Sequence, residues 1–255
     1  QAVTPNGAVR WAFSTPQSVV GLPMVAADGT IYLGSDKLYA LNPDGSKRWE
    51  FEYVERSGGY VYSMGPPVLG PDGAIYVSRI AGNGQQKLFV LEPDRTPRWI
   101  LKRRFSGPVV IGDDGTIFLS EDYGYFSALN PDGVIRWTTS VGNTVLSSGT
   151  PLPGGNVLVP VAGASILEGS VQALTAAGSN LWRFEGGSPA IGTPVIGPDG
   201  AAYAVFNSGR VVALEINGST RWEYQTENLT NTYPNVFSPA LAADGTLYVT
   251  CEQWL

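Results

Sequence analysis

The side chains that carry most enzyme chemistry are scarce in this sequence. The chain has no histidine and a single cysteine, Cys251. The lack of histidine removes the commonest general base, the usual catalytic triads and most zinc or copper sites. One cysteine can form neither an intrachain disulfide nor a cluster of thiolates. We therefore predict no catalytic residue and regard the chain as more suited to binding than to catalysis.

Carboxylates recur beside glycines and raise the question of a calcium site. The recurring residues are Asp28, Asp72, Asp114, Asp199 and Asp244. They lack the ligand spacing of a calcium loop. An Asp followed by Gly instead suits a tight turn, where the side chain caps the backbone and glycine tolerates a positive φ. We predict turn capping and no metal site.

Charge argues against several partner classes. The 255 residues include 16 Lys and Arg against 22 Asp and Glu, a net charge of −6. Phosphate binding relies on clustered Lys and Arg, and the one basic run, at 102–104, is short, so nucleic acid is not expected. No apolar run approaches the roughly 18 residues of a transmembrane helix. No signal-peptide pattern opens the chain, so we expect any targeting segment to have been removed or never to have been present.

The sequence is a repeat of about 43 residues. Prolines at 23, 67, 108, 151, 194 and 239 mark equivalent positions in six units. Each unit holds four short runs rich in Val, Ile, Tyr and Leu, separated by turn residues, which is typical of strands joined by hairpins. Four strands per period predict a propeller blade. The expected fold is all-β, a six-bladed β-propeller of four-stranded antiparallel blades in one domain, 1–255. The blades are predicted at about 18–53, 60–102, 106–140, 145–185, 189–225, and 235–255 plus 1–13.

The two ends of the chain complement each other. Residues 2–11 match 40–49 position for position, so the sequence starts inside a third strand and supplies a fourth. The last residues stop where a third strand of the sixth unit would begin. We expect the N- and C-terminal segments to share the sixth blade. The alternative is a six-unit piece of a longer array, such as one with eight blades.

Six tryptophans occupy one position of the fourth strand. They are Trp11, Trp49, Trp99, Trp137, Trp182 and Trp222. One large aromatic residue per blade at a fixed position favours packing between neighbouring blades over an aromatic ligand ladder. An arginine precedes five of them and points to the other face of the strand, where we expect a solvated edge charge.

Three segments carry a resemblance to a known family. LYALNPDGSKRWEF, YFSALNPDGVIRW and VVALEINGSTRWEY resemble the repeats of the pyrroloquinoline quinone (PQQ) enzyme-like propellers, with their tryptophan-docking motif of an Ala, a turn with Gly, and a Trp about ten residues later. That superfamily includes quinoprotein dehydrogenases and the outer-membrane assembly lipoprotein. The resemblance implies a propeller that usually has eight blades.

The catalytic residues of the enzymes in that superfamily have no counterparts in this sequence. The alcohol dehydrogenases of the superfamily stack PQQ against a ring formed by two adjacent cysteines, and this chain has only Cys251. They also use an Asp beside a calcium held by Glu and Asn, in motifs that no segment here matches. The sugar dehydrogenases use a histidine. No cofactor is therefore expected, and PQQ with calcium at an atypical site is the alternative.

The loops predicted for one face of the propeller vary widely between units. They span 52–62, 81–86, 121–125, 164–168 and 226–233, whereas the turns of the opposite face are short and uniform. Variable loops on a rigid scaffold are where binding residues usually lie, and Tyr and Arg favour interfaces. The candidate binding residues are Tyr53, Arg56, Tyr60, Tyr62, Asp122, Tyr123, Tyr125, Glu227 and Tyr233. Several of these tyrosines could alternatively fill the tops of the blades.

These observations favour a non-catalytic binding or scaffolding propeller. We expect it to work outside the cytoplasm and to recognise a protein, peptide or glycan through its variable loops. The alternatives are a PQQ-dependent oxidoreductase with an atypical site and a structural subunit of an assembly. The sequence leaves the oligomeric state open.

Overall fold

The computed structural model describes residues 1–53, 63–80, 86–142, 145, 148–165, 167–226 and 238–250. These residues form β-strands and two single-turn 3-10 helices, and no α-helix occurs among them. The chain divides into two compact units, Gln1–Arg104 and Phe105–Leu255, which are described in turn.

The first unit contains two four-stranded antiparallel sheets and a two-stranded one. The two-stranded sheet pairs β1 (Ala2–Val3) with β2 (Val9–Trp11). The first blade has the order β3 (Met24–Val25), β4 (Ile31–Gly34), β5 (Leu38–Leu41) and β6 (Lys47–Phe51). The second blade has the order β7 (Val68–Leu69), β8 (Ile75–Ile80), β9 (Gln86–Leu91) and β10 (Pro97–Arg103).

The second unit contains three four-stranded antiparallel sheets and a two-stranded one. The third blade runs β11 (Phe105–Ile111), β12 (Ile117–Glu121), the 3-10 turn η1 (Asp122–Gly124), β13 (Tyr125–Leu129) and β14 (Ile135–Ser140). The fourth runs β15 (Thr150–Pro151), η2 (Pro153–Gly155), β16 (Val157–Ala162), β17 (Gly169–Leu174) and β18 (Asn180–Glu185). The fifth runs β19 (Ala190–Ile196), β20 (Ala202–Phe206), β21 (Arg210–Leu214) and β22 (Thr220–Gln225). A two-stranded sheet pairs β23 (Ala240–Leu241) with β24 (Leu247–Tyr248).

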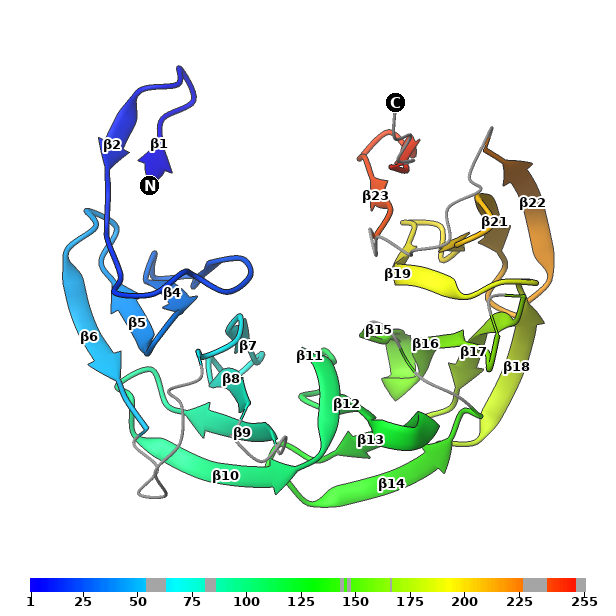
Figure 1. Cartoon of the computed structure of the whole chain (residues 1–255), viewed down its shortest axis with the longest axis horizontal. Helices are drawn as coiled ribbons and strands as arrows, with labels where there is room; N and C mark the ends of the chain where they lie inside the picture. Colours follow the sequence, from blue (N-terminus) through cyan, green and yellow to red (C-terminus); the bar gives the residue numbers. More distant parts are fainter. Residues whose placement is uncertain are drawn as a thin grey trace. The chain divides into compact units, whose positions relative to one another are not determined.

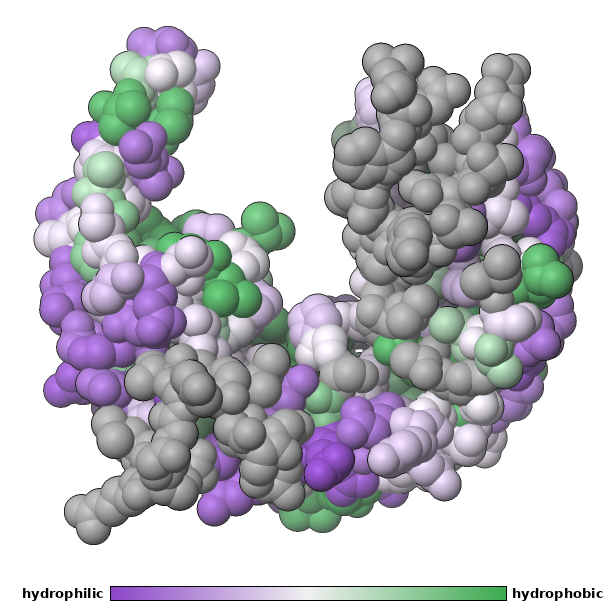
Figure 2. Space-filling model, in the orientation of Figure 1, coloured by the Kyte–Doolittle hydropathy of each residue, from purple (hydrophilic) through white to green (hydrophobic). Residues whose placement is uncertain are grey.

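Neighbouring strands in each sheet are consecutive in the chain, so every blade is an up-and-down meander (Figure 1). The middle strands are buried on both faces, as in β16, all six of whose residues are buried. The fourth strand is the outer edge and alternates between exposed and half-buried residues, as in β14. Hydrophilic residues gather along the outer strands β18 and β22 in Figure 2.

Aspartate caps the tight turns between strands. Asp28 accepts a hydrogen bond from the Thr30 amide at 2.9 Å, and Asp114 does the same for Thr116 at 3.0 Å. The following glycine takes a positive φ, +81° at Gly29. The aspartates at 72, 199 and 244 make the equivalent bond. The prediction that these carboxylates cap turns is confirmed.

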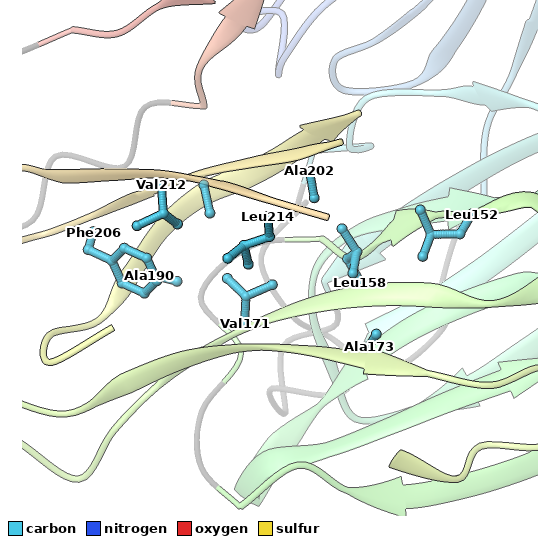
Figure 3. Packing of buried hydrophobic residues seen from close by; sticks show 10 residues of the cluster. Leu152, Leu158, Val171, Ala173, Ala190, Ala202, Phe206, Val212 and Leu214 are labelled. Carbon is cyan, nitrogen blue, oxygen red and sulfur yellow. The ribbon is translucent and has the colours of Figure 1, made fainter. Parts of the chain in front are cut away.

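The core of the second unit lies between consecutive blades. Leu158 and Val171 of the fourth blade face Phe206, Val212 and Leu214 of the fifth (Figure 3). The buried residues at this contact include Phe206, Val171, Val212 and Leu214. Because one sheet cannot bury both of its faces alone, these contacts between blades are what removes the apolar residues of the middle strands from water.

Four of the six predicted docking tryptophans contact the next blade along the chain. The Trp11 and Trp49 indoles donate to the Pro43 and Pro93 carbonyls, both at 3.0 Å. In the second unit Trp137 and Trp182 donate to the Ala176 and Ile216 carbonyls, both at 2.8 Å. Each acceptor lies in a turn between a third and a fourth strand.

The alanine of the repeat lies opposite the tryptophan in the sheet. Trp137 pairs with Ala128 and Trp182 with Ala173, and a register shift follows directly after each alanine. Because the alanine side chain is short, we expect it to leave room for the indole over the third strand. Blade two has Val90 at this position, opposite Trp99.

The chain is an all-β propeller built from four-stranded antiparallel blades, as the repeat predicts. The described residues form five complete blades and two two-stranded sheets, β1–β2 and β23–β24. The pairing of these two sheets as one shared blade stays a prediction, as does the organisation as one domain.

Candidate binding face

The turn between β12 and β13 displays two tyrosines. Tyr123 lies in the middle of η1 with φ +62° and is 85% exposed, while Tyr125 opens β13 and is 46% exposed. A positive φ is unusual for a residue with a bulky side chain and costs about 1–2 kcal/mol. Asp122 precedes them in the same turn and is half-buried. The chain thus holds an aromatic side chain out into solvent at an energetic cost.

A cleft lies beside this turn, at the loop ends of the third and fourth blades. It has a volume of about 460 Å³. Its walls come from the segment after β14, the β16–β17 loop, and the end of β18. The Val141 amide donates to the Gly124 carbonyl at 2.9 Å, which fixes the cleft next to the tyrosine turn.

Backbone contacts shape the β16–β17 loop. The Gly163 amide donates to the Glu168 carbonyl at 2.8 Å, and the Ala164 amide donates to the Glu168 carboxylate at 3.2 Å. These bonds join the two ends of the loop, and Leu167 within it is 74% exposed. An isolated exposed leucine is ordinary, but this one lines a cleft.

Charged side chains line the outer wall of the cleft. The Arg183 guanidinium binds the Glu185 carboxylate, and both residues lie on β18. Glu168 brings a second carboxylate from the loop. The cleft therefore carries two acidic groups and one basic group, and the basic group is already paired.

The predicted contact residues fall in different surroundings. Asp122, Tyr123 and Tyr125 are brought together in one turn. Tyr53 instead packs its ring 4.8 Å from that of Phe89, with the Lys87 ammonium 4.8 Å above it, so its face is engaged within the first unit. Its role as a contact residue stays a prediction. The remaining candidates, Arg56, Tyr60, Tyr62, Glu227 and Tyr233, lie outside the described residues.

Four of the five arginines that precede a tryptophan are partly exposed at the blade edge, as expected, and are also ion-paired. Arg48 reaches Asp28 at 3.1 Å and the Thr30 hydroxyl at 2.7 Å. Arg221 binds Asp199 as well as Glu215, at 2.7 Å from the latter. The same pairing joins Arg98 to Asp72 and Arg136 to Asp114. Each arginine spans the edge of its own blade, from the fourth strand to the capped turn of the first two.

These ion pairs hold the carboxylates ionised. The hydrogen bond from Arg221 lowers the pKa of Asp199, with a smaller contribution from the Ala201 amide. At Asp28 the Thr30 amide is the main cause of the lowered pKa and Arg48 adds to it. The sequence contains a signal for these Asp–Arg ion pairs, because the two residues recur together in four units. Strand alternation gives the direction of an arginine side chain but does not show which carboxylate its end reaches.

The sequence analysis did not predict the residues that line the cleft as site residues. Leu167 and Glu168 fall in the loop predicted to vary, yet neither is aromatic, and Arg183 and Glu185 lie on a strand. Only the contact between the third and fourth blades joins them to Val141. A search for tyrosine-rich loops could not reveal that juxtaposition.

A family profile matches this chain over residues 84–252, more than half of its length, and its description is outer membrane protein assembly factor BamB. The chain belongs to this BamB family. The sequence matches no curated protein.

Solved structures share the propeller fold of the BamB family member described here. BamB from Moraxella catarrhalis is 16% identical with a TM-score of 0.53, covering 94% of this chain and 87% of that one. A protein of unknown function from Bacteroides caccae is 12% identical with a TM-score of 0.55, covering 85% of both chains. A europium-containing methanol dehydrogenase is 11% identical with a TM-score of 0.55, covering 94% of this chain and 76% of that one. At these identities the likeness establishes the fold.

Across the described ranges, no three His, Cys, Asp or Glu side chains gather closely enough to hold a metal ion. The Asp side chains of the turns are engaged by backbone amides and arginines instead. Among the same residues, no helix has the length and apolar character to cross a membrane.

Proposed function

We propose that this chain is a non-catalytic binding propeller that holds a protein or peptide segment on its variable loops. The observation that supports this most directly is Tyr123, a solvent-exposed aromatic side chain kept at a positive φ. Backbone strain that persists in a fold is concentrated at functional sites, where surrounding structure maintains it. Tyrosine is also among the residues that contribute most to protein interfaces.

The family supports the same proposal. Its description names a factor in the assembly of outer membrane proteins. A factor of that kind works on other polypeptides, so a face that binds polypeptide would serve it. We propose by the same reasoning that this chain is located outside the cytoplasm, and fractionation of the source cells with an antibody to it would test the location.

The fourth-strand tryptophans serve the scaffold in this proposal. The indoles of four of them donate to the next blade along the chain, and we expect such contacts to fix the spacing between blades and so keep the loops in place. The proposal therefore gives the tryptophans a docking role and does not use them as ligand contacts. The proposed role needs no cofactor, and addition of PQQ with calcium is expected to change neither the absorbance nor the melting temperature of the protein.

Site-specific photo-crosslinking tests the binding role. A photoreactive benzoylphenylalanine replaces Tyr123 in the source cells, and a second strain carries it at Tyr224, which is 59% exposed on the outer strand β22. We expect a defined protein crosslink from position 123 and none of the same mass from position 224. The same partner should no longer co-purify with the Tyr123→Ala variant.

The opposite results would count against the proposal. Crosslinks of equal yield and pattern at both positions would show a sticky surface with no defined binding face. Unchanged co-purification of the partner with Tyr123→Ala would remove the tyrosine turn from the interaction.

A further inference from the structure

One turn of the fifth blade contains a dipeptide that is prone to spontaneous modification. Asn217 and Gly218 lie in the turn between β21 and β22, and Asn217 is exposed. Asparagine is among the thermolabile residues. In an Asn-Gly dipeptide the backbone nitrogen of the glycine can attack the side-chain amide carbon of the asparagine, because glycine has no side chain to obstruct the approach. This turn is therefore a candidate deamidation site.

Deamidation of this dipeptide needs water as its only co-reactant. The Gly218 nitrogen loses its proton and bonds to Cγ of Asn217, while the bond from Cγ to Nδ2 breaks and the amide nitrogen leaves as ammonia. Water then opens the succinimide ring that has formed. Attack of water at Cγ yields aspartate. Attack at the backbone carbonyl carbon of residue 217 yields isoaspartate, whose main chain is longer by one carbon.

Hydrogen bonds of the native turn engage both reacting groups. The Gly218 amide donates to the Glu215 carbonyl at 2.8 Å, so the nitrogen that would attack has its proton bound within the turn. The Asn217 side-chain oxygen accepts from the Ser219 amide at 3.0 Å and from the Ser219 hydroxyl at 2.7 Å, which fixes the asparagine side chain as the cap of the turn. The turn must therefore open before Gly218 can react with Asn217.

Trp182 of the fourth blade holds this turn closed. Its indole donates a hydrogen bond to the Ile216 carbonyl at 2.8 Å. A Cβ atom at position 218 would stand 2.6 Å from both Cγ and Cδ2 of the indole, so the ring lies directly on Gly218, whose φ is +85°. Opening of the turn moves Ile216 and Gly218 and breaks these contacts. The docked indole therefore makes the open, reactive state of the turn rarer.

The equivalent turns of the first three blades indicate which product the fold accepts. Asp44, Asp94 and Asp132 occupy the position of Asn217 and accept a hydrogen bond from the backbone amide two residues later, at 2.9, 2.9 and 3.0 Å. Aspartate at position 217 can therefore cap the turn in the same way. Isoaspartate lengthens the main chain inside the turn and so alters the surface on which Trp182 docks.

We propose that Asn217 is a site of spontaneous deamidation and that the docking of Trp182 limits its rate. The reaction is slow while the indole lies on the turn and proceeds when the indole leaves it. Isoaspartate formed during such an opening disfavours the return of the indole. The modification then makes a transient separation of the fourth and fifth blades at this turn irreversible.

Peptide mapping by mass spectrometry tests the site in the intact protein. The protein is incubated at mildly alkaline pH, which favours loss of the Gly218 proton, and is then unfolded and digested. Trypsin cleavage after Arg210 and Arg221 releases a peptide in which Asn217 is the one asparagine. We expect deamidation of this peptide to be at least about tenfold faster when the incubation is done in urea, where the turn is open. Equal rates in urea and in buffer, or no deamidation in urea, would overturn the proposal.

Two tryptophan variants separate docking from global stability. Trp182→Phe keeps an aromatic ring but loses the indole donor to Ile216, so it should speed the deamidation of Asn217 in buffer about fivefold. Trp137→Phe loses the same kind of hydrogen bond, to the Ala176 carbonyl, and should leave the rate at Asn217 unchanged. An unchanged rate in Trp182→Phe would overturn the proposed role of docking. An equal increase in both variants would also overturn it, because global unfolding would then control the reaction.

Discussion

Gly178 lies directly beneath the indole of Trp137. A Cβ atom at position 178 would stand 2.5 Å from Cδ2 of Trp137, and the residue has a φ of +78°. Gly45 and Gly218 stand in the same relation to Trp11 and Trp182. The glycine of the repeat therefore has two reasons to be there, since the turn needs a positive φ and the indole needs a flat surface.

Gly178→Ala should destabilise the protein by about 2–3 kcal/mol, because it adds a left-handed backbone strain of about 1–2 kcal/mol to the loss of the indole hydrogen bond, about 1 kcal/mol. Gly200→Ala is the matched control. It has a φ of +81° with nothing within 4 Å of the added Cβ, so only the backbone strain applies. Urea unfolding followed by tryptophan fluorescence measures both. Equal losses of stability in the two variants would show that the indole contact contributes nothing.

The second blade has an arginine where the other docking turns have glycine. Arg95 has a φ of +72° and donates to the Glu50 carbonyl at a long 3.3 Å. Arg95→Gly should stabilise the protein by about 0.5–1 kcal/mol, because the relief of strain exceeds the added entropy of the unfolded chain. Arg95→Lys keeps the strained Cβ and should leave the unfolding free energy unchanged. A loss of stability in Arg95→Gly would mean that the side chain holds the turn in place.

Tyr123→Gly should separate stability from binding. Glycine removes the cost of a positive φ, so the melting temperature should rise by a few degrees, equivalent to about 0.5–1 kcal/mol. The partner captured by crosslinking at position 123 should no longer bind. Thermal unfolding and co-purification measure the two effects on one protein sample. A variant that is less stable than the parent would show that the exposed ring packs usefully against its own turn.

Acid should weaken the first blade through Glu50. Hydrogen bonds from Lys37 and Lys47 lower the pKa of Glu50 from its ordinary 4.5 to about 2. A carboxylate with a lowered pKa stabilises the fold above its unfolded value, and this contribution is lost as the pH falls from about 4.5 to about 2. Glu50→Gln should remove that part of the pH dependence and destabilise the protein at pH 7. The free energy of unfolding in urea, measured at pH 7 and pH 3, gives both slopes, and parallel slopes for the two proteins would contradict the assignment.

The sequence by itself determined the repeat and therefore the blades. Proline spacing, strand alternation and Asp-Gly turns are local signals, because a turn residue acts on the backbone within two positions of itself, as Asp28 does on Thr30. The tryptophan positions likewise indicated contacts between blades, since a large aromatic residue on an outer strand needs a neighbouring surface to cover it. What the repeat could not give was the partner atom of each indole, such as the Ala176 carbonyl for Trp137.

The tertiary structure decided which side chains meet between the units of the repeat. Val141, Glu168 and Arg183 come from three different strands or loops, and only the packing of the fourth blade against the third brings them around one cleft. The ion pair between Arg221 and Asp199 could not be predicted for a related reason. Strand alternation fixes the direction in which a side chain leaves its strand, but it does not determine where the flexible end of that side chain binds. Local periodicity specifies backbone, whereas a binding site depends on distances between segments far apart in the chain.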